Sequence, residues 1–378
     1  MIKKISLSNF KLHDDTEINM GGLTVLTGMN GMGKSSIIQA LLLLRQSYFS
    51  NDLENGLNLR GDFCDLGISG ELACQSSDKH DLKIDMDFSN QAPLSYSFLY
   101  PDNIMDTLLP ASEKNVSCRE KLADYSLFNE NFQYISAFRF GPKKSYNRDT
   151  SLVVSKKQIS KMMGQCEYTI HFLEQYKNQP IQTKELAILD ESDITPDLRL
   201  GEQVGRWLRE ISPFIKIDVK QEGEDFKLNY KFDRQDNLIT ESMSAMNTGF
   251  GITYVLPILV AVLSAKKDAL ILIENPEAHI HPKGQAVLMK LIAMAVHVGI
   301  QVVIETHSDH IVNGSLVAVN QDLINKEELS LYFFDRDEHK HVAKAHQLHV
   351  EEDGHIHPAP PMNFFDQIEI DLRTLAGF

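Results

Sequence analysis

The first fifty residues alternate between apolar and polar positions in a way that predicts three strands followed by a helix. Apolar and polar side chains take turns over residues 2–10 and 15–20, as expected for half-buried strands. Residues 23–27 form a short run of apolar and β-branched side chains, which predicts a fully buried strand. Residues 34–49 continue as a predominantly apolar helix.

The central part of the chain mixes short strands with helices. Residues 101–132 are polar and weakly patterned, as in a long surface loop, and a helical pattern extends over about 155–212. Turn-forming residues separate several short apolar runs, which predicts an antiparallel meander and a later strand pair. These strands are expected at residues 68–75, 81–88, 94–100, 215–220 and 226–232.

The last third alternates helices with strands and carries two uninterrupted aliphatic runs. Residues 270–273 and 302–304 have no polar position, as expected for parallel strands that are buried on both faces. The pattern therefore predicts an α/β fold with a mainly parallel sheet. We expect an N-terminal lobe at residues 1–150, an insertion at 151–235 and a C-terminal lobe at 236–378.

A glycine-rich motif lies between the buried strand and the helix that follows it. Residues 28–35 match G-x-x-x-x-G-K-S/T, a loop whose backbone N–H groups wrap nucleotide phosphates, in the strand–loop–helix context that the motif requires. Lys34 is expected to reach the β- and γ-phosphates, and the Ser35 hydroxyl to bind Mg²⁺. The predicted nucleotide-binding residues are Asn30, Gly31, Met32, Gly33, Lys34, Ser35 and Ser36.

Composition and charge narrow the classes of protein. The chain has 37 basic and 52 acidic residues, a net charge of −15, which disfavours nonspecific nucleic-acid binding over the whole surface. Residues 254–265 form the longest apolar run, about a dozen residues, whereas a membrane span needs about 20. The N-terminus lacks the apolar core of a signal peptide. We expect a soluble, cytoplasmic protein with free thiols at Cys64, Cys74, Cys118 and Cys166.

The two aliphatic runs of the last third end in residues with candidate chemistry. A P-loop requires a carboxylate at the end of a neighbouring strand to hold Mg²⁺, directly or through water. Glu274 closes the first run, and Glu277 follows three positions later. The second run leads into His307 through a Thr-His-Ser sequence. In isolation these residues fit an acidic turn and a hydrogen-bonded polar histidine equally well, but their order after a P-loop favours a nucleotide site.

These three segments together resemble the ATP-binding-cassette (ABC) ATPases of the SMC/RecF/OLD type. Residues 274–282 closely resemble the E-x-P-E-x-H-x-H-P form of OLD-type and related prokaryotic AAA ATPases. The resemblance implies a P-loop NTPase fold, an ABC-type ATPase head with an antiparallel β-subdomain and a mostly helical insertion. It also implies that Glu274 holds Mg²⁺ with Ser35 and that His307 contacts the γ-phosphate of ATP. Residues 353–356 and 363–366 resemble a subgroup with a short, uncharacterised C-terminal region.

About twenty residues before Glu274, the chain carries a divergent match to the signature motif of these ATPases. In the family this segment comes from the opposite protomer and completes the site on the γ-phosphate. The resemblance therefore implies a homodimer that Mg·ATP holds together and hydrolysis releases. The matching residues are Asn247, Thr248, Gly249 and Gly251.

One residue departs from the family pattern. Asn275 stands where the family has the acidic residue that orients the attacking water, and an amide cannot take a proton at neutral pH. Two hypotheses follow. Either Glu277 substitutes as the base, or hydrolysis is slow and ATP binding does most of the signalling. We expect catalytic roles for Glu274, Asn275, Glu277 and His307.

Basic residues gather between positions 139 and 161, although the chain as a whole is acidic. A solvated face is one interpretation, and a contact for nucleic acid or an acidic partner is the other. The candidates for such a contact are Arg139, Lys143, Lys144 and Arg148.

Two functions are consistent with these motifs. The chain is expected either to drive or gate a DNA-related or antiviral defence system as an ATPase, or to act as a nucleotide-gated scaffold that hardly turns over. No nuclease signature accompanies the motifs, so we expect a nuclease or toxin effector on a separate polypeptide. A transporter ATPase is the least favoured class, because no membrane-coupling feature is recognisable.

Overall fold

The computed structural model describes residues 1–113, 119–190, 195–234, 238–337, 339–361, 364–365 and 367–376. Three residues lie outside the described part of the chain: Cys118, for which a free thiol was expected, and Asn363 and Asp366 of the C-terminal motif. The other three cysteines are buried free thiols.

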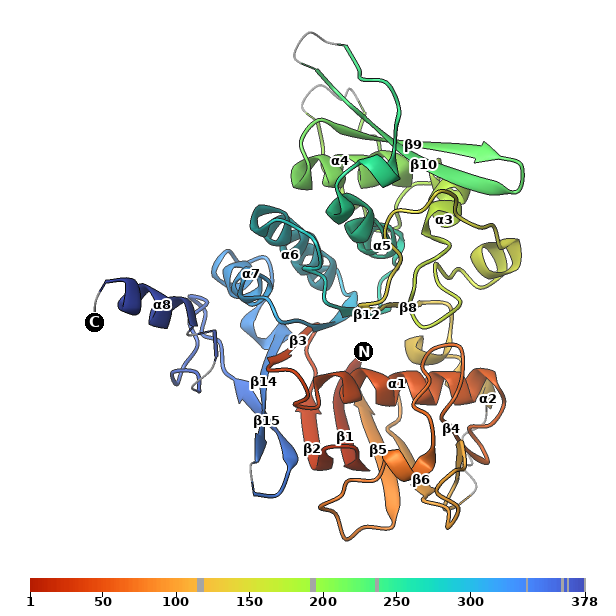
Figure 1. Ribbon diagram of the computed structural model, residues 1–378, viewed down its shortest axis with the longest axis vertical. Coiled ribbons are helices and arrows are strands. Elements are labelled where there is room, and N and C mark those ends of the chain that lie inside the picture. The colour runs from red at the N-terminus through yellow and green to blue at the C-terminus, as the bar shows by residue number, and fades with distance from the viewer. Residues whose placement is uncertain are drawn as a thin grey trace.

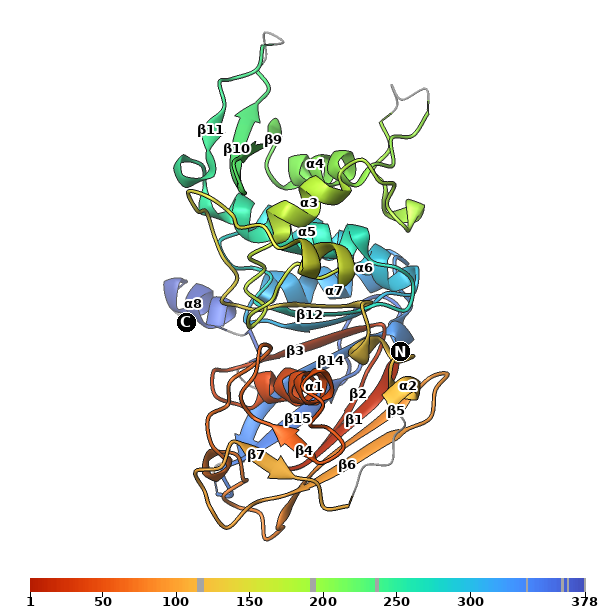
Figure 2. The same cartoon turned by 90° about the vertical axis from the view of Figure 1, so that its right-hand side faces the viewer.

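A six-stranded sheet forms the centre of the molecule (Figures 1 and 2). Neighbouring strands are parallel except for the antiparallel edge strand β15, so the predicted parallel sheet is confirmed. The P-loop strand β3 lies between two strands of the C-terminal part. In order across the sheet, the strands are β15 (Val342–Leu348), β14 (Leu329–Asp337), β3 (Leu23–Gly28), β13 (Gln301–Glu305), β12 (Leu270–Glu274) and β8 (Phe132–Ile135).

The two faces of this sheet bury different cores, because successive side chains of a strand point to opposite sides. Along β12, Ile271 and Ile273 join one core, whereas Leu270 and Leu272 join the other. The first core lies under α5 (Phe250–Ser264), α6 (Pro282–His297) and α7 (Asp309–Asn320). Uninterrupted aliphatic strands are therefore required, as the sequence indicated.

The second core lies between the central sheet and an antiparallel sheet, with α1 (Lys34–Phe49) between them (Figure 2). The antiparallel sheet has the order β2–β1–β5–β6, and its strands confirm most of the predicted meander. Residues 68–75, predicted as a strand, instead contain a 3₁₀ turn at Ser69–Glu71. The elements of this region are β1 (Ile2–Phe10), β2 (His13–Asn19), β4 (Gly56–Asn58), β5 (Asp81–Phe88), β6 (Leu94–Leu99), β7 (Leu108–Pro110) and α2 (Arg119–Leu122).

The insertion packs on the helical face of the central sheet, at the top of Figure 1. It contains helices and a strand pair, as expected, and β10 also pairs with β11 beyond residue 235. The proposed boundaries at residues 150 and 235 stay predictions, because strands from both lobes share one sheet. The elements are a π-helical turn (Ser151–Ser155), α3 (Thr169–Tyr176), α4 (Leu200–Ile211), β9 (Ile215–Glu222), β10 (Asp225–Phe232) and β11 (Met243–Ser244). A last helix, α8 (Gln367–Leu375), follows β15.

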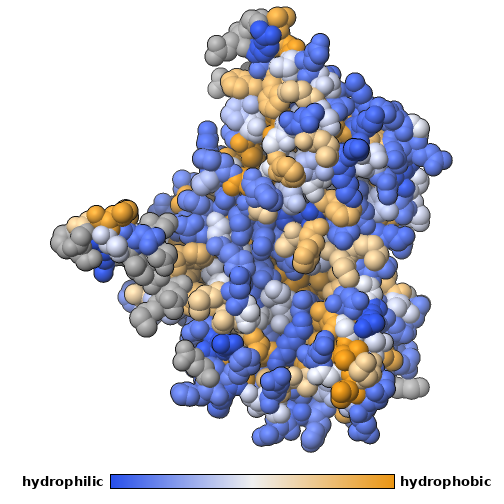
Figure 3. Space-filling model, viewed as in Figure 1, coloured by the Kyte–Doolittle hydropathy of each residue, from blue (hydrophilic) through white to orange (hydrophobic). Residues whose placement is uncertain are grey.

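No helix in the described part of the chain is long and apolar enough to cross a membrane. Figure 3 shows a mostly polar face with apolar residues gathered in patches. One patch lies at the tip beyond β10, and Leu238 and Ile239, which follow that strand, are exposed.

Candidate nucleotide site

The P-loop connects β3 to α1 through glycines in the left-handed region of backbone space. Gly28 has φ 134° and Gly33 has φ 97°, and both also lack room for a side chain. A Cβ at Gly28 would lie 2.3 Å from the Phe334 carbonyl oxygen, and one at Gly33 would lie 2.9 Å from the His13 ring. The loop therefore needs glycine for close packing as well as for its backbone turn.

His13, the first residue of β2, contacts the P-loop through a hydrogen bond. Its Nε2 lies 3.0 Å from the Gly33 carbonyl oxygen and its Nδ1 lies 3.0 Å from Thr16 Oγ1. Because the carbonyl can only accept, Nε2 carries the proton and Nδ1 accepts from the threonine hydroxyl. Burial lowers the pKa of His13 to about 4, with a smaller contribution from Lys11, although the bond to Gly33 opposes the shift. His13 is therefore a neutral structural support.

Lys34 and Ser35 begin α1 at the mouth of the loop. Lys34 Nζ donates to the carbonyl oxygens of Gly28 (2.9 Å) and Met29 (2.7 Å), and the side chain is buried. Burial lowers the pKa of Lys34, although the charge of Glu305 opposes this shift. The lysine ammonium and the backbone N–H groups of the loop thus provide positive charge where the motif predicts phosphates.

The sheet brings two carboxylates together at its carboxyl edge. Glu274 ends β12 and Glu305 ends β13, and the two residues are register partners across the parallel strands. Glu274 accepts bonds from the Tyr134 hydroxyl (3.0 Å) and the Ala137 N–H (3.1 Å). Burial raises the pKa of Glu274, although these two hydrogen bonds oppose the shift.

Glu305, rather than Glu274, contacts the P-loop serine. Ser35 Oγ donates to Glu305 Oε1 at 2.8 Å, whereas the expected role of Glu274 as the Mg²⁺ partner of Ser35 stays a prediction. Burial raises the pKa of Glu305 to about 7, and the neighbouring charge of Glu274 adds to this, although the bond from Ser35 opposes it. Glu305 was not among the site residues predicted from the sequence. Its signal was available, since it ends an aliphatic run just as Glu274 does.

Asn275 and Glu277 shape the turn after β12. Asn275 has φ 45° and donates its N–H to the Glu305 carbonyl oxygen at 2.8 Å. Glu277 accepts from Thr306 Oγ1 (2.9 Å) and from the His307 N–H (2.9 Å), so it joins this turn to the one after β13. Partial burial lowers the pKa of His307, and the charge of Lys34 adds to this, whereas Glu277 opposes it.

Arg139 is a structural residue, which corrects its expected role as a surface contact. Its side chain is only 2% exposed, because the guanidinium lies under the turn after β12. It donates to four backbone carbonyl oxygens at 2.8–3.1 Å, those of Ser136, Tyr254, Glu274 and Asn275. A nucleic acid cannot reach this side chain.

The other residues of the basic cluster remain accessible. Lys144 and Arg148 are exposed, and no ion pair of theirs occurs in the described part of the chain. Lys143 is half-buried, with its ammonium over the Phe140 ring. These three side chains remain a predicted contact surface.

A cavity of about 520 Å³ opens over the P-loop. It is lined by the predicted residues of the loop together with Glu274, Asn275, Glu305 and His307. The loop at 63–66 also lines this cavity. The structure thus gathers residues separated by about 270 positions in the sequence into one site.

The signature segment does not reach this cavity, since the described lining contains no residue of 247–251. The segment instead leads into α5, with Gly249 as the N-cap and Gly251 in the first turn of the helix. A Cβ at Gly251 would lie 2.0 Å from the His279 carbonyl oxygen, so this glycine allows α5 to approach the turn after β12.

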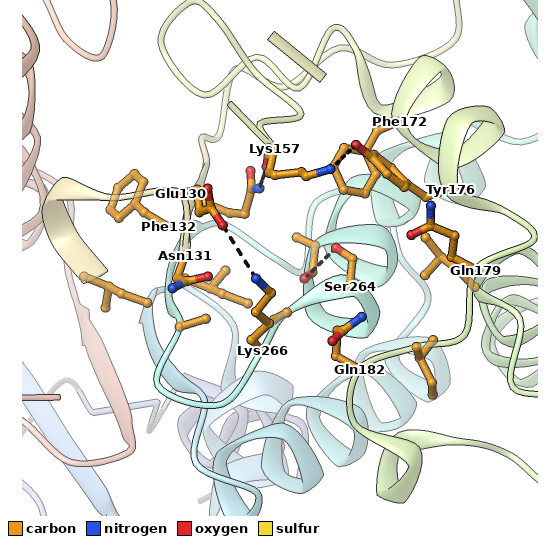
Figure 4. A pocket seen from close by; sticks show the side chains of 18 of the residues that line it. Glu130, Asn131, Phe132, Lys157, Phe172, Tyr176, Gln179, Gln182, Ser264 and Lys266 are labelled. Carbon is orange, nitrogen blue, oxygen red and sulfur yellow. Dashed lines mark hydrogen bonds and ion pairs between the residues drawn. The ribbon is translucent and has the colours of Figure 1, made fainter. Parts of the chain in front are cut away.

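A second cavity of about 130 Å³ lies at the other edge of the sheet (Figure 4). It is lined by the starts of β8 and β12, by α3 and by the end of α5. Lys157 donates to the Tyr176 hydroxyl, and Lys266 pairs with Glu130 at 3.5 Å. No residue expected from the sequence to bind nucleotide lines this cavity, so it is distinct from the P-loop site.

A family model described as "AAA domain, putative AbiEii toxin, Type IV TA system" matches residues 23–313. The chain belongs to this AAA family. The match includes both the P-loop and the Thr-His-Ser turn, and with the fold it confirms the resemblance to SMC/RecF/OLD-type ABC ATPases. Residues 324–375 match a second family, described as a protein of unknown function (DUF3696).

Solved structures of SMC heads share the fold of this AAA domain. An SMC head bound to the C-winged helix domain of ScpA is 13% identical, with a TM-score of 0.54, over 93% of this chain and 99% of that one. An SMC head with an extended coiled coil, bound to the C-terminal domain of ScpA from Pyrococcus furiosus, is 12% identical, with a TM-score of 0.51, over 100% and 98%. A search of curated proteins gave no significant match.

Proposed function

We propose that this AAA-family protein binds and hydrolyses ATP and dimerises when Mg·ATP is bound. The observation that carries this proposal is the single cavity that collects the P-loop, the carboxylates of β12 and β13, and His307. Phosphoryl transfer depends mainly on positioning and charge stabilisation, and these groups supply both. His307 lines the same cavity as Lys34, and we propose that it contacts the γ-phosphate there.

The donors at the carboxyl edge of the sheet fit Mg²⁺. The ion prefers oxygen ligands and commonly takes one or two carboxylates together with substrate phosphates. Ser35 Oγ is such a donor, and the carboxylates of Glu274 and Glu305 are the two candidates to join it. When bound, the ion would neutralise charge on the phosphates, and the chain's own residues would hold it against the P-loop.

Dimerisation is supported by the separation of the two motifs. The signature segment lies outside its own P-loop cavity, and Gly249 faces open space in the described structure. A second copy that places this segment over the nucleotide would complete the site. Each nucleotide would then be held between two heads.

The effector is proposed to be a separate protein. The description of the matching family names an AbiEii toxin and a type IV toxin–antitoxin system. The two similar SMC heads are bound to domains of ScpA. These properties belong to those proteins. They support a role for this ATPase in gating a partner, with a DNA-related or antiviral defence system as the setting.

Mass measurement tests the dimer. The wild-type chain is expected to be monomeric without nucleotide and dimeric with Mg·ATP, whereas Lys34→Ala stays monomeric in both conditions. Light scattering at matched protein concentrations measures this, and Lys144→Ala is the control at an exposed lysine. A Lys34→Ala protein that binds ATP and dimerises like wild type would contradict the proposal.

Asn275 favours a second candidate function, that of a slow ATPase whose nucleotide occupancy assembles partners. An amide can orient water but cannot accept its proton. Single-turnover hydrolysis by Asn275→Glu separates the candidates, with Glu277→Gln as the comparison. A gain of tenfold or more in Asn275→Glu supports the scaffold. Unchanged hydrolysis in Asn275→Glu, together with a large loss in Glu277→Gln, supports an active ATPase that uses Glu277 as its general base.

Nucleic acid remains a proposed ligand of the exposed basic residues. Lys143, Lys144 and Arg148 would contact phosphates, which makes binding depend steeply on salt. Replacing Lys144 and Arg148 together by Glu is expected to weaken binding of a DNA duplex and to reduce its salt dependence. Binding that is identical to wild type would assign these residues to a solvated face.

A further inference from the structure

Three carboxylates surround the turns after β12 and β13, and they differ in how their oxygens are used. Both oxygens of Glu274 accept hydrogen bonds, from Tyr134 and Ala137. Both oxygens of Glu277 accept as well, from Thr306 and His307. Each oxygen of these two carboxylates thus has a hydrogen-bond partner within the chain.

Glu305 is the exception. Its Oε1 accepts from Ser35, but its Oε2 is buried and has no hydrogen-bond partner among the described residues. The side chain is 6% exposed and lines the P-loop cavity. A buried carboxylate oxygen without a partner is costly, and in native proteins such an atom commonly marks a place that a ligand or ion completes.

We infer that Glu305, together with Ser35, is the carboxylate that binds the nucleotide's Mg²⁺, and that Glu274 is a positioning residue. This inference rests on the proposed function. Ser35 Oγ is the P-loop group expected on Mg²⁺, and Glu305 is the carboxylate in contact with it, at 2.8 Å. An ion beside Ser35 would also satisfy the unpartnered Oε2.

The position of Glu274 supports this division of roles. Its bonds come from Tyr134 on β8 and from the segment just after that strand, on the side of β12 away from β13. β13 lies between β12 and the P-loop strand, so the end of β13 is the nearer of the two to Ser35. Glu274 thereby holds the turn that carries Asn275.

The test measures how much Mg²⁺ strengthens nucleotide binding. The full chain, Glu305→Gln, Glu305→Asp and Glu274→Gln are titrated with MANT-ADP in Mg²⁺ and in EDTA, which avoids hydrolysis. In wild type Mg²⁺ is expected to tighten binding at least tenfold. Glu305→Gln should bind MANT-ADP in EDTA at least as well as wild type, but its tightening by Mg²⁺ should fall at least tenfold. Glu305→Asp keeps the charge on a shorter side chain, so its tightening by Mg²⁺ should lie between the values for wild type and Glu305→Gln.

A second readout follows the metal itself. Electron paramagnetic resonance of Mn²⁺ with protein and ADP reports the bound fraction, which should fall in Glu305→Gln and be retained in Glu274→Gln. Thermal unfolding without nucleotide checks the fold of each variant.

The outcomes separate this inference from the proposed function. A wild-type chain that binds no nucleotide overturns both. Wild-type nucleotide binding with unchanged Mg²⁺ coupling in Glu305→Gln overturns only the inference, as does an equal loss in Glu274→Gln. Loss of binding in EDTA by both Glu305 variants would show that this residue holds the loop, and would also overturn it.

Discussion

Two regions of this protein differ in how many contacts a single chain provides. We call them the P-loop end, around residues 28–36, and the signature end, around residues 246–251. At the P-loop end, Gly33 packs on His13, and Lys34 and Ser35 have hydrogen-bond partners. At the signature end, Met246 is 47% exposed and Phe250 is 59% exposed beside the α5 N-terminus. One chain therefore holds its P-loop residues in place and leaves the signature segment exposed, which is the arrangement that the proposed composite dimer site requires.

Arg139 connects the two ends, and its removal is expected to have the largest effect. It bonds Tyr254 on the signature helix as well as the carbonyls of Glu274 and Asn275. Arg139→Ala should lower the free energy of unfolding by at least about 3 kcal/mol, because it removes four hydrogen bonds from a charged donor, each typically worth about 1.5–3 kcal/mol. Urea denaturation measures this change. Arg148→Ala is the control on an exposed side chain, and an equally small effect at both positions would show that the two ends are independent.

Lowering the pH should reduce the stability of the folded protein through His13, which packs against the P-loop. The pKa of His13 is about 4 in the folded protein against about 6.5 when unfolded. Between these values the unfolded chain binds the extra proton, so stability falls as pH decreases from 6.5 and the loss is complete below 4. At about 1.4 kcal/mol per pH unit, the loss reaches about 3 kcal/mol.

The His13 prediction is read as a difference between variants, because other groups titrate too. The free energy of unfolding of His13→Gln should vary less between pH 7 and 4 than that of wild type. His346→Gln, at an exposed position on β15, should follow wild type. Parallel curves for all three proteins would show that His13 is not buried in its neutral form.

Substitutions at two glycines of the signature end provide a further test, with a smaller expected effect on the free energy of unfolding. Gly251→Ala should cost about 1–3 kcal/mol, since its Cβ would overlap the His279 carbonyl oxygen. Gly249→Ala should stay within about 0.5 kcal/mol of wild type, because a Cβ there meets open space and φ is −52°. Thermal unfolding compares the two. If Gly249→Ala also weakens Mg·ATP-dependent dimerisation, the open space beside Gly249 is part of the dimer interface. If Gly249→Ala is instead destabilised without nucleotide, the signature end is already packed against other residues in the single chain.

The sequence predicted the elements around the site with good accuracy. Helix α1 spans Lys34–Phe49, as the apolar pattern indicated, and the aliphatic runs at 270–273 and 302–304 are parallel strands. These signals are strong because strands buried on both faces favour apolar side chains on both faces. Residues 68–75 are the counterexample, since a short apolar run carries too little pattern to distinguish a strand from a turn.

Site residues were harder to assign where their role depends on neighbours from other strands. Arg139 belongs to a basic stretch, and sequence cannot show that this one guanidinium is buried under backbone carbonyls. Glu274 and Glu305 each end an aliphatic strand, so the pattern does not say which of them faces Ser35. Strand order decides this, because β13 lies next to the P-loop strand and β12 does not.

The sequence by itself determined that a strand, a glycine loop and a helix form a phosphate site, because that chemistry is local and spans only a few residues. It also predicted that Glu274 ends a buried strand of the same sheet. Only the tertiary structure decided which carboxylate meets Ser35, that Arg139 is internal, and that the signature lies outside its own cavity. These outcomes depend on strand order and burial, which arise from contacts between residues far apart in the chain.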